Sequence, residues 1–392
     1  MIDRDAAPAL RALAQRYPVV SLTGPRQSGK TTLCRAVFPA HPYVTLEPLD
    51  VRAFAREDPR GFLAQHQAGA IIDEVQRVPE LLSYLQADVD ERPKPGRFIL
   101  TGSQELAVGA TVAQSLAGRV GRLELHPCSW GELQRFANAP ADILEVLWTG
   151  GYPRILDRSI PPSQWLADYV ATYVQRDVRQ LLNVVDLEAF TNFVRLCAGS
   201  TATPVHLTRL GADAGVSHPT VRAWLSVLEA SFLIRRLPAW HPHPRKRVVR
   251  AAKLHVVDSG LCCYLLGIRE PEQLRAHPLR GAIFESWVAM DVMKQGAHRG
   301  APHTLSHYRE EGGLEVDLVL GDLPSPLLVE MKSGATVASD FIDGVRRVAE
   351  RLAGRDANTR SATRVVYGGT MPQTRGATDI VPWNHVDRVS WG

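Results

Sequence analysis

Residues 24–31, GPRQSGKT, limit the folds open to this chain more than any other segment. Gly24, Gly29, Lys30 and Thr31 occupy the fixed positions of the pattern Gly-x-x-x-x-Gly-Lys-Ser/Thr. The apolar run YPVVSLT precedes the pattern, and the helical segment TLCRAVF follows it. Glycines at a strand-to-helix turn let backbone N–H groups and the amino end of the helix face an anion. The segment therefore predicts a phosphate-binding loop in a parallel α/β sheet.

The residues of this loop are typical of a site for ATP with Mg²⁺. Lys30 is expected to neutralise the β- and γ-phosphates, and the Thr31 hydroxyl is expected to bind Mg²⁺. The predicted nucleotide contacts cover the whole loop: Gly24, Pro25, Arg26, Gln27, Ser28, Gly29, Lys30, Thr31 and Thr32.

Two further strands are predicted to bring polar residues to the same edge of the sheet. The run AGAIIDEV ends in Asp73, which is expected to hold the Mg²⁺ shell, and Glu74, which is expected to polarise the attacking water. In the run RFILTGSQEL, Ser103 is the predicted sensor of the γ-phosphate, with Thr101 and Gln104 as alternatives. Lys30 and Glu74 are thus the predicted catalytic residues for ATP hydrolysis.

Three arginines are candidates for a group that reaches the γ-phosphate of a neighbouring subunit. Arg119 and Arg122 stand in SLAGRVGRLEL, ahead of another strand, and Arg176 stands in a long amphipathic helix over residues 165–186. The alternatives are exposed arginines with no phosphate contact, or an Arg176–Asp177 pair that braces the helix. The sequence does not choose among the three, but a finger of this kind implies a homo-oligomer.

Strands predicted at 18–23, 43–46, 69–73, 97–101 and 122–126 alternate with helices, as in a parallel sheet with crossover connections. The order of loop, Asp-Glu strand, sensor strand and arginine pair resembles the AAA+ P-loop ATPases. It is most similar to a bacterial and archaeal family whose ATPase domain precedes a C-terminal region of uncharacterised function. The segments GGYPRIL, TYVQRDV, KLHVVDSGL and FESWV extend the resemblance along nearly the whole chain. The resemblance implies ATP binding and a connection with nucleic acid.

The middle of the chain predicts a helix-turn-helix followed by a wing. In HLTRLGADAGVSHPTVRAWLSVLEA, two helices flank a Gly-Val-Ser turn, with Ser217 as the N-cap of the second and Pro219 in its first turn. Ala223 and Trp224 are predicted to pack. Residues His218, Thr220, Arg222 and Ser226 are candidates to reach base edges.

The segment after these helices alternates like two strands joined by a long loop. It carries seven Lys and Arg residues and no acid between Ser231 and Val257, a density typical of phosphate contact. DNA is the predicted partner, although winged helices also bind proteins, and a protein partner stays open.

The C-terminal region carries four residues that match the PD-(D/E)xK nuclease pattern: Glu285, Asp317, Glu330 and Lys332. Val316 stands where the proline of that pattern would be. Glu285, Asp317 and Glu330 are the predicted ligands of Mg²⁺ or Mn²⁺, and Asp317, Glu330 and Lys332 the predicted catalytic residues. The expected element order is α-β-β-β-α-β. The alternatives are a salt-bridged hairpin on an unrelated domain, or the same fold without cleavage.

These readings predict an α/β protein of three domains: an AAA+ ATPase domain at 1–150, a helical lid and winged helix at 151–255, and a nuclease-like domain at 256–392. The leading hypothesis is a DNA-engaging ATPase, and the alternative is a nucleotide-dependent protein-interaction switch with a non-cleaving C-terminal domain. The 392 residues contain no apolar run long enough to span a bilayer, and the amino terminus is charged, so we expect a cytoplasmic protein with no membrane partner. The five cysteines are expected to be buried and reduced.

Overall fold

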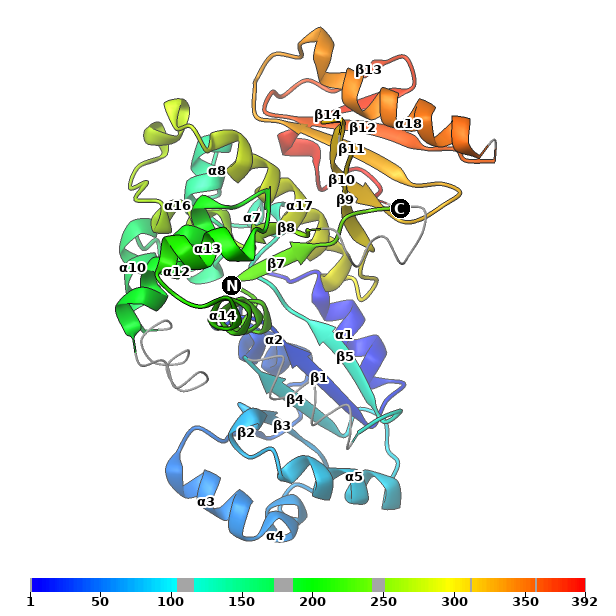
Figure 1. Cartoon of the computed structure of the whole chain (residues 1–392). Helices are drawn as coiled ribbons and strands as arrows, with labels where there is room; N and C mark the ends of the chain where they lie inside the picture. Colours follow the sequence, from blue (N-terminus) through cyan, green and yellow to red (C-terminus); the bar gives the residue numbers. More distant parts are fainter. Residues whose placement is uncertain are drawn as a thin grey trace. The chain divides into compact units, whose positions relative to one another are not determined.

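The computed structural model describes residues 2–103, 116–172, 186–241, 251–310, 312–356 and 358–391. The chain forms two compact units (Figure 1), which are described separately. The first contains residues 1–128, 230–232 and 294–302, and the second contains 129–229, 233–293 and 303–392. The predicted residues Gln104, Arg176, Arg245, Lys246 and Arg247 lie outside the described residues.

A five-stranded parallel sheet forms the centre of the first unit. Its strands, in spatial order, are β2 (Tyr43–Thr45), β3 (Ala70–Asp73), β4 (Phe98–Gly102), β1 (Val19–Thr23) and β5 (Val120–Glu124). The helices of this unit are α1 (Ala6–Ala14), α2 (Lys30–Val37), α3 (Leu49–Glu57), α4 (Pro59–Ala64), the 3-10 turn η1 (Val75–Arg77) and α5 (Leu81–Glu91). All five predicted strands are confirmed.

Helices cover both faces of this sheet. Successive residues of β1 point to opposite sides, and each side packs in its own core. Val19 lies in one core with Leu85 of α5, whereas Val20 lies in the other core with Leu10 of α1 and Leu33 of α2. Every residue of β1, β3 and β4 is buried. With both faces covered, polar chemistry is confined to the ends of the strands.

The second unit begins with helices and a small antiparallel sheet. The helices are α7 (Trp130–Leu133), α8 (Ile143–Thr149), α9 (Pro153–Asp157), α10 (Pro162–Thr172), α12 (Leu187–Gly199), α13 (Leu207–Ala214), α14 (His218–Ala230), α16 (Ser259–Leu265), η3 (Pro271–Ala276) and α17 (Arg280–His298). The last residue of α14 and the last five of α17 belong to the first unit. The sheet has the order β6 (Thr203–Pro204), β8 (Lys253–Val256), β7 (Ile234–Leu237). Trp224 of α14 packs edge-on against Phe190 and Phe193 of α12 at 5.1 and 5.2 Å between ring centroids.

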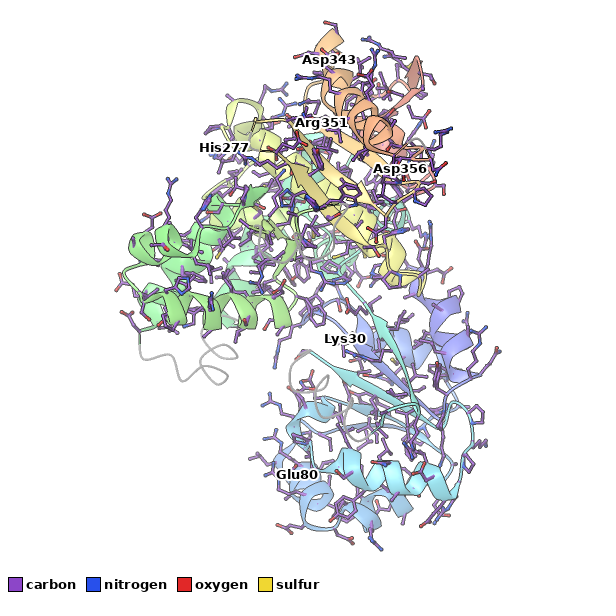
Figure 2. All side chains as sticks on the ribbon, turned by 45° about the vertical axis from the view of Figure 1, so that its right-hand side comes forward. Lys30, Glu80, His277, Asp343, Arg351 and Asp356 are labelled. Carbon is purple, nitrogen blue, oxygen red and sulfur yellow. The ribbon has the colours of Figure 1, made fainter. Side chains whose placement is uncertain are left out.

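A six-stranded sheet follows in the same unit. Its spatial order is β13 (Gln373–Arg375), β14 (Thr378–Pro382), β12 (Ala362–Tyr367), β11 (Leu327–Lys332), β10 (Glu315–Leu320) and β9 (Leu305–Arg309). Helix α18 (Asp343–Arg355) packs on the sheet through Val345 and Val348, which share a core with Val319 and Leu328. Figure 2 marks this helix by Asp343, Arg351 and Asp356. Along the chain, α17, β9, β10, β11, α18 and β12 follow the predicted α-β-β-β-α-β order.

The short 3-10 turns of this region are η4 (Ser339–Ile342) and η5 (Trp383–His385). All five cysteines are buried, as predicted. Within the described parts of the chain, no helix is both long and apolar enough to cross a membrane.

Candidate functional site

The loop at residues 24–31 turns around the side chain of Lys30, the first residue of α2 (Figure 2). The Lys30 ammonium donates hydrogen bonds to the carbonyl oxygens of Gly24 at 2.9 Å and Pro25 at 2.8 Å. Burial lowers the pKa of Lys30 to about 8, although Glu74 and Asp73 raise it in part. Two uncharged carbonyl groups do not compensate a buried positive charge, so the loop has the electrostatic character of an anion site.

The two glycines of the pattern are required by backbone geometry. Gly29 precedes α2 with a φ of 95°, in the left-handed region. At Gly24, a Cβ atom would lie 2.1 Å from the carbonyl oxygen of Leu125 at the end of β5. The loop thus approaches the neighbouring strand too closely for any side chain.

Arg4 supports the loop from outside and was not predicted. Its guanidinium donates to the carbonyl oxygen of Ser28 at 2.6 Å and to that of His126 at 2.8 Å. Arg4 stands just before α1, far from the loop in sequence, so only the tertiary fold brings the two together. The bonds fix the loop backbone relative to the segment that follows β5.

Asp73 lies at the carboxyl end of β3, where four donors hold its carboxylate. Its Oδ2 atom accepts from Thr31 Oγ1 at 2.9 Å and from the Tyr43 hydroxyl at 2.7 Å. Its Oδ1 atom accepts from the Thr101 hydroxyl and from the backbone N–H of Glu74, the latter at 3.1 Å. The two residues predicted to bind Mg²⁺, Thr31 and Asp73, are therefore in direct contact. Tyr43 was not predicted, because one tyrosine in a short exposed strand carries no distinctive pattern.

Glu74 follows Asp73 and is held away from the end of the strand by a left-handed backbone with φ of 58°. Gln76 donates to Glu74 Oε2 at 2.5 Å and to Ser103 Oγ at 3.2 Å, so it joins the predicted base to the predicted sensor. Burial raises the pKa of Glu74, while Lys30 and Arg26 lower it. Gln76 was not predicted, but its position two residues after Glu74, in a turn at the strand end, is the feature that could have indicated it.

The structure distinguishes the two described arginine candidates. Arg119 makes a two-point ion pair with Asp90, at 2.5 Å from Nε and 2.9 Å from the second nitrogen. Its carbonyl accepts from Val19 N–H, at the end of β1 opposite the loop and roughly 16 Å from it by strand rise. Arg122 lies exposed on β5, opposite Ser21. A contact of either residue with the phosphate of a neighbouring subunit stays a prediction.

The acids of the C-terminal region surround a lysine that was not predicted. Lys253 of β8 places its ammonium 2.5 Å from Glu285 Oε1, 2.9 Å from Glu315 Oε1 and 3.4 Å from Asp317 Oδ1. The Lys253 side chain is 2% exposed. A lysine at the start of the strand-like run KLHVV was the available sign of such a role.

Two further oxygens of the predicted metal site are engaged, whereas Glu330 Oε2 is buried without a hydrogen-bond partner. Asp317 Oδ2 accepts from the backbone N–H of Met331 at 2.9 Å, and Glu330 Oε1 pairs with Lys332 at 2.6 Å. Burial, and next to it the charge of Asp317, raise the pKa of Glu330 to about 7, although Lys332 opposes the shift.

The three predicted metal ligands, Glu285, Asp317 and Glu330, lie close enough to influence one another electrostatically, and metal binding by them stays a prediction. No group of three or more His, Cys, Asp or Glu side chains within the described residues is arranged to hold a metal ion. Lysine ammonium groups, chiefly that of Lys253, supply positive charge next to these carboxylates, as a metal cation would.

Comparison with known proteins identifies the first domain. Residues 16–134 match a family described as an AAA domain, and residues 140–272 and 280–386 match the domains of unknown function DUF8612 and DUF4143. Uncharacterized protein Rv2008c of Mycobacterium tuberculosis and Uncharacterized protein Mb2031c of Mycobacterium bovis are each 32% identical over 339 residues, which cover 85% of this chain and 74% of theirs. The chain belongs to their family and carries an AAA-type ATPase domain. Among solved structures, the Walker-type ATPase PABY2304 of Pyrococcus abyssi is similar over 68% of this chain and 96% of its own, with 16% identity and a TM-score of 0.47.

In the DUF8612 region of this AAA family member, α13 and α14 flank the predicted turn. The backbone N–H of Thr220 donates to Ser217 Oγ at 3.4 Å, which confirms Ser217 as an N-cap. The Thr220 hydroxyl also bonds to Ser217, at 2.8 Å, and is therefore engaged in the cap. The other three candidates for base contact, His218, Arg222 and Ser226, are exposed and four residues apart, so they form one stripe along α14. Trp224 packs as predicted, but Ala223 is exposed and does not.

The positive charge of the segment after α14 is partly neutralised within the fold. Arg236 of β7 pairs with Glu229 of α14 at 2.5 and 2.9 Å, and Lys253 is surrounded by acids. Of the three basic residues of this segment that the structure describes, Arg235, Arg236 and Lys253, the last two are thus engaged in ion pairs.

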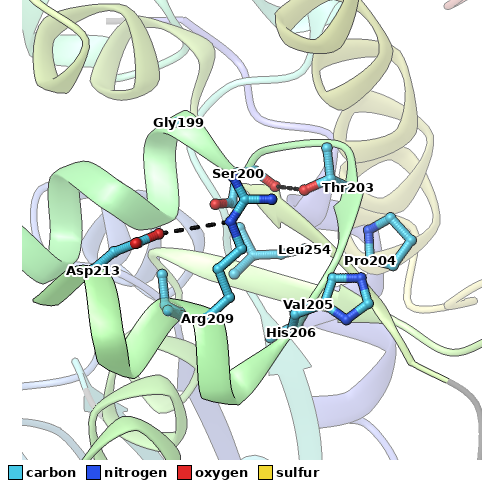
Figure 3. A pocket seen from close by; sticks show the side chains of 10 residues that line it. Gly199, Ser200, Thr203, Pro204, Val205, His206, Arg209, Asp213 and Leu254 are labelled. Carbon is cyan, nitrogen blue, oxygen red and sulfur yellow. Dashed lines mark hydrogen bonds and ion pairs between the residues drawn. The ribbon is translucent and has the colours of Figure 1, made fainter. Parts of the chain in front are cut away.

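A separate cavity of about 340 Å³ lies beside α13 (Figure 3). It is lined by the end of α12, by β6, and by Arg209 and Asp213 of α13, which are 3.8 Å apart. The stripe of His218, Arg222 and Ser226 on α14 does not contribute to its lining.

Proposed function

We propose that this AAA-type protein hydrolyses ATP at residues 24–32 and couples hydrolysis to engagement of DNA. The observation that carries the proposal is the contact between Thr31 and Asp73 beside the buried Lys30 ammonium. It joins a phosphate-binding group and two oxygen ligands suited to Mg²⁺ in one site. Glu74, whose pKa is raised, lies at the same edge of the sheet and can accept a proton.

In this proposal each residue of the site has one role. The loop N–H groups and Lys30 bind the β- and γ-phosphates, and Lys30 exchanges its carbonyl partners for phosphate oxygens. Thr31 and Asp73 would hold Mg²⁺, which neutralises phosphate charge when bound. Glu74 orients the attacking water, and Gln76 holds the side chains of Glu74 and Ser103 in position through its two hydrogen bonds. An arginine from a second copy of the chain would complete the site, so we propose a homo-oligomer.

The proposed DNA contact rests on the arrangement of the second unit. The chain order α12, β6, α13, α14, β7, β8, with the sheet order β6-β8-β7, is compatible with a winged helix and supports this proposal. In such a domain the second helix of the turn enters the major groove, and α14 offers His218, Arg222 and Ser226 on one exposed stripe. The basic segment with Arg245, Lys246 and Arg247 would contact phosphates.

Metal-dependent cleavage by the C-terminal domain is not supported by the described residues. The element order is compatible with a nuclease-like fold, but lysine ammonium groups already pair with Glu285, Asp317 and Glu330. The second candidate function is a nucleotide-dependent switch whose C-terminal domain binds a protein partner without cleaving nucleic acid, and the engaged acids of this domain are compatible with it.

Fluorescence anisotropy with a labelled DNA duplex at several salt concentrations tests the DNA proposal. We expect binding by the full chain, and weaker binding by the His218→Ala/Arg222→Ala variant. Replacement of Arg245, Lys246 and Arg247 by Ala should reduce the slope of log affinity against log salt by about 0.9 for each lost phosphate contact. Arg347→Ala, an exposed arginine on α18, is the matched control. Equal affinity and slope in all variants would reject this surface and favour the protein-interaction switch.

A further inference from the structure

We propose that Lys253 is the resident cation of the C-terminal acidic cluster, defined here as Glu285, Glu315, Asp317 and Glu330. Its ammonium takes the place of a divalent metal ion and ties strand β8 to helix α17 and strand β10. The cluster is then a permanent internal joint that does not cleave phosphodiesters. This inference does not depend on ATP hydrolysis or on DNA binding.

The first argument is the match between donors and acceptors. A lysine ammonium has three N–H donors, and three carboxylates face Lys253, at 2.5, 2.9 and 3.4 Å. Glu285 comes from α17, whereas Glu315 and Asp317 come from β10. The ammonium therefore has one acceptor for each proton, drawn from two separate elements.

The second argument is burial. The Lys253 side chain is 2% exposed, and the Glu285 and Asp317 side chains are each 13% exposed. A buried ammonium without partners is very costly, and so is a buried carboxylate without a cation. Burial lowers the pKa of Lys253, but Asp317, Glu285 and Glu315 more than offset this, so the lysine stays charged.

The third argument is competition for the same oxygens. Asp317 Oδ1 faces Lys253 and Oδ2 accepts from Met331 N–H, while Glu330 Oε1 is paired with Lys332. A divalent ion would have to displace the Lys253 ammonium. Lys253 stands on β8, which is hydrogen-bonded to β6 on one side and β7 on the other. The displaced ammonium would remain buried and lose its partners, so the cluster selects against the metal.

A second polar contact fixes the same two elements next to this ion pair. His255 Nδ1 lies 3.0 Å from Ser286 Oγ, and Thr201 Oγ1 lies 2.8 Å from the same oxygen. His255 and Ser286 are two and one residues after Lys253 and Glu285, respectively. Strand β8 and helix α17 are thus joined at two successive points, which is expected of a structural joint.

Mn²⁺ binding to the full chain, measured by electron paramagnetic resonance, tests the proposal. The parent protein carries Asp73→Asn, so that the nucleotide site does not contribute metal binding. We expect no saturable Mn²⁺ binding by the parent or by Lys332→Met, the matched loss of a lysine that pairs with Glu330. Lys253→Met should show saturable Mn²⁺ binding where the parent shows none, since a positive charge at the cluster is removed. Saturable binding by the parent that Asp317→Asn abolishes would overturn the proposal.

Thermal unfolding covers the case in which Lys253→Met folds poorly. We expect this variant to lose stability and the triple variant Lys253→Met/Glu285→Gln/Asp317→Asn to recover much of it, because the neutral set leaves no uncompensated charge. Stability of Lys253→Met equal to that of the parent without metal would contradict the proposal. So would nicking of supercoiled plasmid by the wild-type chain with Mn²⁺ that is lost in Asp317→Asn.

Discussion

At the scale of single residues, Lys30 brings a positive charge into a buried loop where its described hydrogen-bond partners are two uncharged carbonyl oxygens. Asp73 has the opposite situation, since its carboxylate accepts four hydrogen bonds. The lysine is therefore prepared to exchange partners when phosphate arrives, whereas Asp73 is already fixed in place. We infer that Lys30 controls nucleotide affinity and that Glu74, beside Asp73, controls turnover.

The variants Lys30→Ala and Glu74→Gln test this division of roles. Lys30→Ala should weaken ATP binding at least about a hundredfold, because phosphate charge is left unpaired in a buried loop. Glu74→Gln should bind ATP within about threefold of the wild type and lose at least about a hundredfold in kcat, since it cannot accept a proton. Calorimetric ATP titration and a phosphate-release assay measure the two effects, with Arg11→Ala on the exposed side of α1 as the control.

His126 links stability of the first unit to pH. Its side chain is 1% exposed, and burial lowers its pKa to about 4, although Glu124 opposes the shift. The folded state thus keeps His126 neutral, while the unfolded chain takes up a proton below about pH 6.5. The stabilisation is complete above pH 6.5 and declines as pH falls toward 4, by about 3 kcal/mol in total.

Urea unfolding of the wild type and of His126→Gln between pH 7.5 and 5 measures this effect. The transition of the first unit is recognised as the one that ADP shifts to higher urea concentration. The stability difference between the two proteins should shrink as the pH falls. A difference that stays constant over this range would show that His126 does not titrate as described.

At the scale of elements, Asp258 connects two segments that the sequence presents as separate landmarks, GGYPRIL and VVDSGL. Its carboxylate caps α16 by accepting from Leu261 N–H at 2.9 Å, and it also accepts from Gly151 N–H at 2.7 Å. Gly150 has a φ of 70°, and a Cβ atom there would lie 2.3 Å from Asp258 Oδ1. Glycine is required at position 150 because the loop passes directly over a buried carboxylate.

Asp258→Ala should lower the free energy of unfolding of the second unit by about 2–3 kcal/mol, because two backbone N–H groups lose a charged acceptor. Asp258→Asn should cost less, since the amide oxygen can still cap α16. Urea denaturation followed by far-ultraviolet circular dichroism gives the values. Asp213→Ala, which removes an exposed acid on α13, serves as the control and should change stability little. An equal effect of the Asp258 and Asp213 substitutions would remove the proposed role of the cap.

The elements were predictable to the extent that they depend on local pattern. The strand before the loop, the strand ending in Asp73, and the Ser217 cap each follow from residues close together in sequence. Tyr43 and Arg4 were not predictable, because their partners lie 30 and 24 residues away and depend on how strands and helices pack. Lys253 was counted as surface charge, because the sequence does not indicate which basic residues become buried.

At the scale of the whole molecule, the sequence does not indicate which distant segments of the chain belong to the same compact unit. Residues 230–232 and 294–302 belong to the compact unit formed by residues 1–128, although they lie far from it in sequence. The AAA-type domain was predictable because one loop and one strand end carry its chemistry. The C-terminal acids were predictable as a group, but their cation was not, since it comes from β8 and lies 32 residues before Glu285.

The most direct test of the account is steady-state ATP hydrolysis by the full chain with Mg²⁺, measured with and without a DNA duplex at low salt. We predict turnover by the wild type that DNA increases, a smaller increase for His218→Ala/Arg222→Ala, and no turnover for Glu74→Gln. Turnover in Glu74→Gln equal to the wild type would contradict the proposed nucleotide site. Wild-type turnover that DNA leaves unchanged would contradict the coupling to DNA.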